Sequence, residues 1–567
     1  MARFIWALAS FSLFLTLASA GSSCKPVPGD DDWPSAAKWS KLNNTVNGHL
    51  IATTPLPSVC HNGPIGTYDA DACTAIRDEW TLSTTFIYAP AEAMGPYFQN
   101  QSCDPFSQQH QPCLLDNYAS YSLNVTGASD VVAGIKFAHD NNVRLVIKNT
   151  GHDFTGKSTG KGSLSLWMHN LNTTTVIPEY KSTNYTGPAA KLGAGVVAAN
   201  VYTTVSEAGY RILGGTCPSV GLAGGYTSGG GHSLLNGLYG MAADAVLEWE
   251  VITASGEHLI ATPTSNQELY WALSGGGAGN LGVVLSMTTK IFPEGIIGSA
   301  SLAFNSTDPS YWPAMEALLM FLPKYVDAGP NAWDFVITQT GFTSLALTAP
   351  NLKPAGVQDL LQPLLDTLDD HNISYSFTPE SFPTYHEYFN TKIGTGINIE
   401  PANINLASRL IPRSALQNVT QTASILTAMK AFIDAEHWVI GCHAFNVADI
   451  EHPENAVFSK WREAVANCNI VDYWDWDVSW DEMMSRKSLL VNTLIPGLEA
   501  ATPGSGTYLN EIDAQYKGDW KTQLYAETYD PLLRLKEKYD PGHLFYARTA
   551  PGSDYYTTDG AGRLCKA

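Results

Sequence analysis

The most constraining feature of this sequence is a glycine-rich run from Gly214 to His232. Glycine recurs in it too often for a helix or strand of a core, because each glycine adds backbone freedom that a regular element must restrict. A loop of this composition lets backbone N–H groups approach an anionic or planar ligand closely. The alternative interpretation is a flexible surface loop.

A second loop favours the ligand-binding interpretation. Residues 144–148 are typical of a buried strand, and the turn 149–153, Asn-Thr-Gly-His-Asp, follows directly. In α/β folds, ligands usually bind beyond the carboxyl ends of strands. Upstream, Ser129 and Asp130 are placed to cap a helix that ends at Asn141. The sequence also predicts helices over 198–208 and 529–538, and strands over 246–254 and 258–261.

Three further motifs resemble binding sites of other kinds, namely a nicotinamide site, a substrate-stacking segment and a metal site. Residues 277–282 match the Gly-x-Gly-x-x-Gly dinucleotide fingerprint, but that motif needs a following helix, and the strand-like residues 283–292 follow instead. We therefore exclude a Rossmann-type nicotinamide site. The acidic and aromatic segment 472–477 either stacks a sugar or aromatic substrate, or is a strand that alternates between core and solvent. No metal site is predicted, because no common zinc spacing relates His437, Cys442, His443 and His452.

The N-terminus predicts secretion. An apolar stretch from Phe4 to Leu17 leads to Ala18-Ser19-Ala20, a site of the kind that signal peptidase cleaves, so residues 1–20 are assigned to a signal peptide. The stretch is shorter than the roughly 20 apolar residues that span a bilayer. We predict an extracellular glycoprotein, with Asn-x-Ser/Thr acceptors at Asn43, Asn100, Asn124, Asn172, Asn184, Asn305, Asn372 and Asn418.

The length and net charge of the chain limit its domain organisation and the classes of molecule that it can bind. The 567 residues exceed the ~250–300 at which a single core stops growing, so we expect at least two domains and a ligand cleft between them. The formal net charge of −21 argues against nucleic acid and against an anionic membrane surface. The predicted partners are therefore small neutral or cationic molecules.

The nine cysteines leave one without a disulfide partner in an oxidising compartment. Cys217, alone within the glycine-rich run, is the natural odd one. Eight cysteines allow on the order of 100 connectivities, so pairing by sequence proximity is a hypothesis. It suggests Cys60–Cys73, Cys103–Cys113 and Cys442–Cys468, with Cys24 and Cys565 as possible partners.

Three parts of the sequence together resemble a known family. They are the segment 148–158 (Lys-Asn-Thr-Gly-His-Asp-Phe-Thr-Gly-Lys-Ser), the segment 217–221 with 229–232, and the segment 539–541 with 544–546. These motifs are similar to the berberine-bridge-enzyme-like branch of the vanillyl-alcohol-oxidase flavoprotein superfamily, and the Asn-Thr-Gly-His-Asp form resembles its secreted fungal members. The resemblance covers nearly all of the chain after about residue 115.

The resemblance implies an α+β, two-domain fold of the vanillyl-alcohol-oxidase or PCMH type. We expect a loop-rich, disulfide-tied N-terminal region at 21–114 and a PCMH-type FAD-binding domain at 115–294. A substrate domain with an antiparallel sheet is then expected at 295–504, and the segment 505–567 completes the FAD-binding domain.

FAD is the implied cofactor, held by two covalent bonds. In the family, the histidine that matches His152 bonds to the 8α-methyl group of the isoalloxazine, and the cysteine that matches Cys217 bonds to C6. An imidazole nitrogen and a thiolate are nucleophiles suited to an electron-poor flavin. The other implied FAD-binding residues are Lys148, Asn149, Thr150, Gly151, Asp153, Gly156, Ser158, Gly215, Thr216, Val220, Gly221, Gly224, Gly225, Ser228, Gly231, Ile252 and Asn510.

His232, Tyr508 and Glu511 are the catalytic candidates. His232 stands where plant members carry a substrate-facing tyrosine, and histidine titrates near working pH, which suits an acid or base. The alternative is a histidine that is only hydrogen-bonded beside the flavin. Tyr508 and Asn510 match a Tyr-x-Asn motif of the family, and the sequence leaves open whether Tyr508 or Glu511 is the base.

We therefore predict a monomeric, secreted FAD-linked oxidase. It would oxidise an alcohol or a natural-product intermediate by hydride transfer to flavin N5, with O2 reduced to H2O2. In the family, valine at the position of Val220 accompanies oxidase behaviour, because that residue gates dioxygen. The alternatives are an oligosaccharide oxidase and a flavoprotein without turnover that acts as a binding protein.

Overall fold

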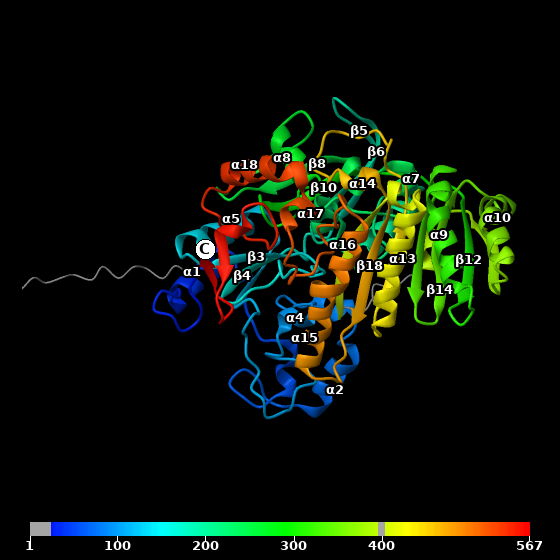
Figure 1. The fold of residues 1–567 in the computed structure, drawn as a ribbon. Helices are drawn as coiled ribbons and strands as arrows, with labels where there is room; N and C mark the ends of the chain where they lie inside the picture. The colour runs from blue at the N-terminus through cyan, green and yellow to red at the C-terminus, as the bar shows by residue number, and fades with distance from the viewer. Residues whose placement is uncertain (1–23, 395–402) are drawn as a thin grey trace, which may run out of the picture.

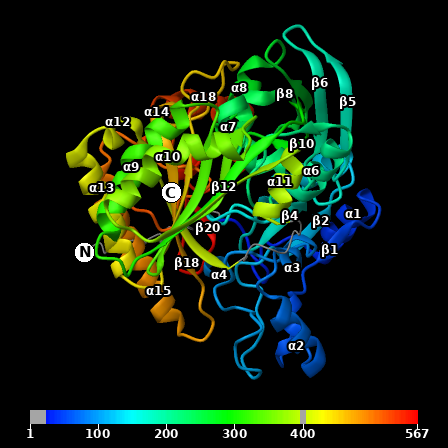
Figure 2. The same ribbon diagram turned by 90° about the vertical axis from the view of Figure 1, so that its right-hand side faces the viewer.

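The computed structural model describes residues 24–394 and 403–567, and the predicted signal peptide lies outside them. Three main sheets, of four, five and seven strands, organise the chain (Figures 1 and 2). Helices and mostly antiparallel strands alternate along it, which confirms the predicted α+β class. The region before the strand at 121–124 consists mainly of loops and short helices: α1 (Ala36–Thr45), α2 (Ala70–Glu79), α3 (Ser83–Ile87) and α4 (Pro96–Gln99).

The four-stranded sheet carries the first predicted loop. Its order is β1 (Leu50–Ala52), β2 (Tyr121–Asn124), β4 (Ser163–Trp167) and β3 (Arg144–Lys148). Strands β2, β4 and β3 run parallel, and helix α5 (Ala128–Asp140) forms the crossover from β2 to β3 that parallel strands require. The loop after β3 therefore starts at the carboxyl edge of the parallel strands, as predicted.

The start of α5 corrects one prediction. The helix begins at Ala128, and neither Ser129 nor Asp130 caps it. The carboxylate of Asp130 instead accepts hydrogen bonds from the backbone N–H and the hydroxyl of Thr126, and so holds the chain that enters the helix. Other predicted elements are confirmed to within two residues at each end, namely α6 (Ala198–Glu207), α18 (Tyr529–Tyr539), β8 (Val246–Ile252) and β9 (His258–Ala261).

The five-stranded sheet is antiparallel throughout. Strand β10, at its centre, follows directly on residues 277–282, so the strand predicted after that glycine motif is confirmed. The order is β5 (Thr174–Lys181), β6 (Thr186–Gly193), β10 (Val283–Lys290), β8 and β9.

The seven-stranded antiparallel sheet has one apolar face and one face that carries both polar and apolar side chains, called the mixed face below. Because side chains alternate along a strand, Trp333, Cys442 and Cys468 all point into the apolar core on one face of the sheet. Helices α9 (Tyr311–Asp327), α10 (Pro354–Asp370) and α13 (Val419–Asp434) cover that core (Figure 1). The opposite face carries Asp334, His443 and Asn467. The strand order is β15 (Tyr375–Phe382), β12 (Ile297–Asn305), β14 (Gly341–Pro350), β13 (Ala332–Thr338), β17 (Val439–Ala444), β18 (Ala464–Tyr473) and β16 (Ile404–Pro412).

The C-terminal segment returns to the first half of the chain. Helix α18 lies beside α8 (Gln267–Leu273), as Figure 1 shows. The buried ammonium of Lys536 donates to the carbonyls of Asn280 and Phe545 and pairs with Asp540. This segment is therefore fastened to the loop that precedes β10. The domain boundaries themselves stay predictions.

The four proposed disulfides are all present. Cys60–Cys73, Cys103–Cys113 and Cys442–Cys468 are local pairs, and Cys24–Cys565 joins the two ends of the described chain. Cys217 is the cysteine that lies outside them. The pairing hypothesis from sequence proximity is therefore confirmed.

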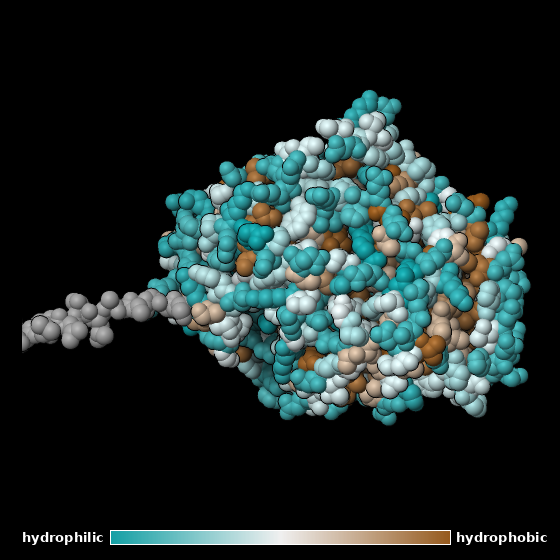
Figure 3. Space-filling model, turned by 45° about the horizontal axis from the view of Figure 1, so that its top comes forward, coloured by the Kyte–Doolittle hydropathy of each residue, from teal (hydrophilic) through white to brown (hydrophobic). Residues whose placement is uncertain are grey.

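Hydrophilic residues predominate on the face drawn in Figure 3, with hydrophobic residues mostly in small groups between them. Across residues 24–394 and 403–567, the helices include none with the length and apolar character of a membrane span.

Candidate functional site

A cavity of about 430 Å³ lies between the two predicted loops and the mixed face of the seven-stranded sheet. The loop after β3, the glycine-rich run and residues 277–282 form one side, and residues of β16 and β18 form another. The C-terminal segment adds Tyr508, Asn510 and Glu511, and the pair Phe545 and Tyr546. Tyr473 lines the cavity and is 53% exposed, so the cavity reaches the surface there.

Hydrogen bonds within the first loop fix its shape. The carboxylate of Asp153 accepts from the backbone N–H groups of Lys157 and Ser158 and from the hydroxyl of Ser158. At the start of the loop, the buried ammonium of Lys148 donates to the carbonyls of Phe86 and Ala89. The N-terminal region thus holds this loop in place, although its sequence carried no recognisable function.

The glycine-rich run is held against the start of α6. The carbonyls of Pro218 and Val220 accept from the backbone N–H groups of Ala199 and Ala198. An added Cβ at Gly221 or at Gly224 would lie 2.6 Å from Nδ2 of Asn149. A side chain at either position would therefore displace the amide of Asn149 where the two loops meet.

His152 and Cys217 face the cavity and share one contact. The hydroxyl of Ser219, which is fully buried, lies 2.8 Å from Nε2 of His152 and 3.2 Å from Sγ of Cys217. Burial lowers the pKa of His152 to about 4, because the charged imidazolium loses its hydration. The imidazole is therefore neutral, and one ring nitrogen keeps a lone pair for a nucleophilic attack.

His232 and Glu511 form a half-buried pair in the cavity wall. Nε2 of His232 is 3.1 Å from Oε1 of Glu511, and Nδ2 of Asn467 donates to Oε2 of Glu511 at 2.7 Å. Burial alone would lower the pKa of His232, but the charge of Glu511 and the hydrogen bond to it outweigh burial. Together with Asp334, they raise this pKa above its ordinary value.

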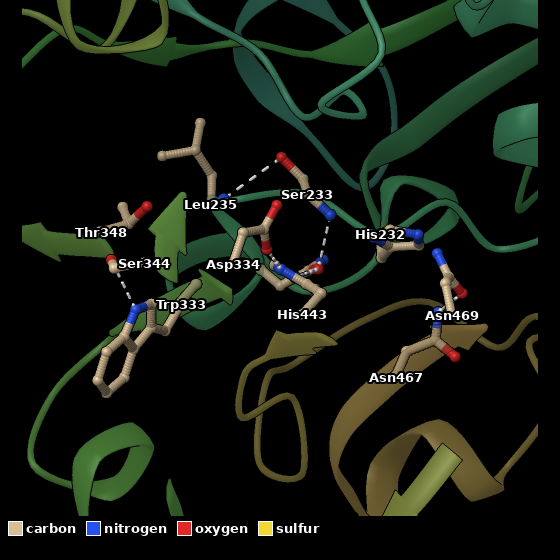
Figure 4. Close-up of polar contacts among 12 residues, drawn as sticks. His232, Ser233, Leu235, Trp333, Asp334, Ser344, Thr348, His443, Asn467 and Asn469 are labelled. Carbon is tan, nitrogen blue, oxygen red and sulfur yellow. Dashed lines mark hydrogen bonds and ion pairs between the residues drawn. The ribbon is translucent and has the colours of Figure 1, made fainter. Parts of the chain in front are cut away.

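A second histidine, His443, lies beside His232, as Figure 4 shows. The ring centroids of His232 and His443 are 5.1 Å apart. Nδ1 of His443 bonds to Asp334, and its Nε2 is 3.3 Å from Oδ1 of Asn236. Asp334, His443 and Asn467 are opposite one another in the register of β13, β17 and β18, which places them in a row beside His232.

Tyr508 lies close to the His232–Glu511 pair, and hydrogen bonds fix the position of its hydroxyl. Its hydroxyl accepts from Nδ2 of Asn510 at 2.7 Å and donates to the carbonyl of Tyr226 at 3.4 Å. Burial, and secondarily the charge of Glu511, raise the pKa of Tyr508 far above its ordinary value. Tyr508 is therefore suited to donate a hydrogen bond rather than to accept a proton.

Most of the residues that the sequence singled out line the cavity. The three catalytic candidates His232, Tyr508 and Glu511 do so, and their roles stay predictions. The FAD-binding candidates in the lining are Asn149, Thr150, Gly151, His152, Asp153, Ser158, Gly215, Thr216, Cys217, Val220, Gly221, Gly224, Gly225, Ser228 and Asn510.

Four candidates lie outside the lining, where packing explains them better than direct contact with a ligand. Lys148 turns away to the N-terminal region, as described above. Gly156 lies against Phe98, and Gly231 lies against Ala242, each too close to accept a Cβ. Ile252 is buried in the core of the four-stranded sheet region.

The structure also adds residues that the sequence analysis missed. All of residues 277–282 except Asn280 line the cavity, although this segment was excluded as a nicotinamide site, and its glycines were the available signal. Asn467 and Asn469 alternate with apolar residues in β18, which indicated polar positions on one face of a strand. In the segment 472–477, only Asp472 and Tyr473 belong to β18, and Trp474 packs near Trp476 beyond it.

The cavity wall fits FAD. Among the described residues, Oδ1 of Asn149 and Oγ of Ser228 are buried oxygens with no hydrogen-bond partner, and both belong to the lining. Buried polar atoms are nearly always hydrogen-bonded, so these two suit the polar groups of a bound cofactor. The glycines of the lining permit close approach of backbone N–H groups, and His152 and Cys217 supply two nucleophiles.

Two family models match the chain. One, described as an FAD binding domain, matches residues 120–262, and the other, described as berberine and berberine like, matches residues 507–550. The two matched segments contain both predicted loops and the C-terminal residues of the cavity.

Similar proteins come from fungi. The bifunctional decalin synthase calF of Penicillium decumbens is 62% identical over 550 residues, with 96% of each chain covered. The VAO-type flavoprotein oxidase VAO615 of Thermothelomyces thermophilus is 47% identical over 551 residues, again with 96% of each chain covered. The crystal structure of the VAO-type flavoprotein MtVAO615 from Myceliophthora thermophila C1 has a TM-score of 0.93 at 46% identity, covering 96% of this chain and 100% of that chain.

The His232–Glu511 pair predicts a pH-dependent stability. The folded protein holds the proton of His232 more tightly than the unfolded chain does, because the pKa of His232 is raised. This contribution is fully present below about pH 6.5 and is lost as pH rises through the folded pKa. In Glu511→Gln, burial then outweighs the remaining charge of Asp334 and lowers the pKa, so protonation at low pH destabilises the fold.

The expected result is that Glu511→Gln loses more thermal stability at about pH 5 than at about pH 8. Melting temperatures of both proteins across this range test it. Glu463→Gln, which removes an exposed carboxylate paired with Lys460, serves as the matched control for loss of one charge. An equal loss of stability at both pH values would mean that Glu511 does not control the proton of His232.

Proposed function

This chain belongs to the berberine-bridge-enzyme-like FAD-linked oxidoreductases of the vanillyl-alcohol-oxidase type, and we propose that it is a secreted oxidase with bicovalently bound FAD. The observation that carries the proposal is that His152 and Cys217 line one cavity and contact the same hydroxyl, that of Ser219. Two nucleophiles from loops 65 positions apart in sequence thus face the same space.

The proposed proton acceptor is the His232–Glu511 pair. Bound FAD would supply a hydride acceptor at N5 and a route for the electrons to dioxygen, with hydrogen peroxide as the product. Glu511 removes the hydroxyl proton of the substrate, while His232 and Asn467 hold the carboxylate of Glu511 in position. Tyr508 is the weaker candidate, because burial and the charge of Glu511 oppose its ionisation.

The substrate is proposed to be an apolar alcohol of the natural-product type. Ile404, Leu406 and Val471 line the cavity on the side of the seven-stranded sheet, and Tyr473 lines its mouth. A sugar chain needs hydrogen-bond partners along its length, and these side chains supply few. The name of the relative calF, a decalin synthase, points the same way, because decalin is a fused bicyclic hydrocarbon.

Secretion is supported by the four disulfides, which form and persist in oxidising compartments. The side chains at all eight predicted glycosylation sites are exposed or half-buried, as enzymatic glycosylation requires.

Peroxide release from the purified holoenzyme tests the proposed function. We expect peroxide, and anaerobic bleaching of the flavin, with polycyclic or polyene alcohols and not with cello-oligosaccharides. Glu511→Gln should slow bleaching on the order of 10²–10⁴-fold, as expected for loss of a general base. Peroxide with sugars alone would favour the oligosaccharide oxidase, and no bleaching with any of these compounds would favour the flavoprotein without turnover.

The two bonds predict that flavin stays with the acid-precipitated protein. His152→Ala and Cys217→Ala should each retain one bond, and the double variant should release all of its flavin. Absorbance of the washed precipitate and of the supernatant measures the retained fraction. Release of free FAD from the unmodified protein would contradict the bicovalent proposal.

A larger side chain at Val220 is expected to slow the reaction of the reduced flavin with dioxygen. Val220 lines the cavity and is half-buried, so an added methylene would take up space that dioxygen needs beside a bound flavin. Val220→Leu should slow reoxidation of the reduced flavin by about tenfold or more, equivalent to about 1.4 kcal/mol in the barrier. Reduction by substrate should change much less.

Stopped-flow measurement of the two half-reactions separates these effects. Val220→Ala is the matched variant, and its smaller side chain should not slow reoxidation. Equal slowing of both half-reactions in Val220→Leu would indicate general distortion of the site, and unchanged reoxidation would mean that oxygen reaches the flavin by another route.

A further inference from the structure

Ser219 occupies a position between the two nucleophiles that no motif of the sequence indicated. Its Oγ is 2.8 Å from Nε2 of His152 and 3.2 Å from Sγ of Cys217. The side chain is fully buried, and both loops around it are fixed, one by Asp153 and one by the backbone of α6. The contact therefore belongs to the rigid part of the site.

One hydroxyl can serve both neighbours at once. A serine hydroxyl donates one hydrogen bond and accepts up to two. Because burial keeps the imidazole of His152 neutral, a single ring nitrogen carries hydrogen and the other carries the lone pair. If Nε2 carries the hydrogen, it donates to Oγ of Ser219, and the hydroxyl hydrogen of Ser219 is then available to Sγ of Cys217.

We propose that Ser219 is the positioning residue for attachment of FAD to this chain. Its hydroxyl accepts from Nε2–H of His152, which directs the lone pair of Nδ1 toward the cavity, and it donates to Sγ of Cys217, which favours the thiolate. The inference rests on the proposed bicovalent function and extends it to the way in which the bonds form.

The attachment steps balance with dioxygen as the oxidant. Each step replaces one C–H bond of the flavin, by a C–N bond at the 8α-carbon or by a C–S bond at C6. One proton leaves from carbon, and one leaves from the imidazole or the thiol; the imidazole proton departs from Nε2 through Oγ of Ser219. The two electrons left on the flavin and the two protons pass to dioxygen, which becomes hydrogen peroxide.

The test follows attachment itself and needs no substrate. Protein produced in a riboflavin-starved host is mixed with FAD in air, and flavin retained after acid precipitation is measured over time. The variants Ser219→Ala and Ser219→Thr are made in the His152→Ala and Cys217→Ala backgrounds, so that each bond is followed separately. Ser233→Ala is the matched control, because Ser233 is a buried serine that directly follows the glycine-rich run and lies outside the cavity lining.

We expect Ser219→Ala to slow both attachments by about tenfold or more, equivalent to about 1.4 kcal/mol in each barrier. Ser219→Thr, which keeps the hydroxyl, should restore most of the rate, and Ser233→Ala should behave as the unmodified protein. Quenching of FAD fluorescence on mixing reports non-covalent binding, which should survive in every variant. NMR of the isolated flavin peptide should show the bond at Nδ1 of His152.

Three outcomes would overturn the inference while leaving the two bonds intact: wild-type attachment rates in Ser219→Ala, a threonine variant as slow as the alanine variant, or a bond at Nε2. Loss of non-covalent binding in Ser219→Ala would also overturn it, by assigning Ser219 to packing. Complete release of FAD from the unmodified protein would instead remove the bicovalent proposal on which the inference rests.

Discussion

Antiparallel register across β13, β17 and β18 places Asp334 opposite His443, and His443 opposite Asn467. The polar wall beside His232 depends on this register, because a slip by one residue would turn all three side chains toward the apolar core under the helices. The disulfide Cys442–Cys468 joins β17 and β18 on that core face. In the register of the two strands, this pair is adjacent to the pair His443 and Asn467. The covalent link and the alternation of side chains therefore support the same register.

The opposite wall depends on buried lysines at the ends of its loops. Lys148 holds the first loop to the N-terminal region, and Lys536 holds the loop before β10 to the C-terminal segment. A buried ammonium group is costly unless its hydrogens are bonded, and both lysines bond to backbone carbonyls. Parts of the chain that are far apart in sequence are thus fixed around one cavity.

Two histidines of this cavity have opposite electrostatic environments. Burial without a charged partner lowers the pKa of His152 to about 4, whereas Glu511 raises the pKa of His232 against the effect of burial. The first environment suits a neutral nucleophile, and the second suits a proton carrier. The proposed division of roles between attachment of the cofactor and handling of a proton rests on this difference.

The sequence by itself determined the local features of this protein. Glycines 214–231, the His152 and Cys217 loops and the three local disulfide pairs could be predicted, because each depends on short-range patterns or on residues close in the chain. The α+β class followed from the family resemblance that such motifs carry. Only the tertiary structure decided that Ser219 lies between His152 and Cys217, and that Asp334, His443 and Asn467 form a row beside Glu511. Those contacts join residues from separate loops and strands, and their distances are set by strand register and packing, which no local pattern encodes.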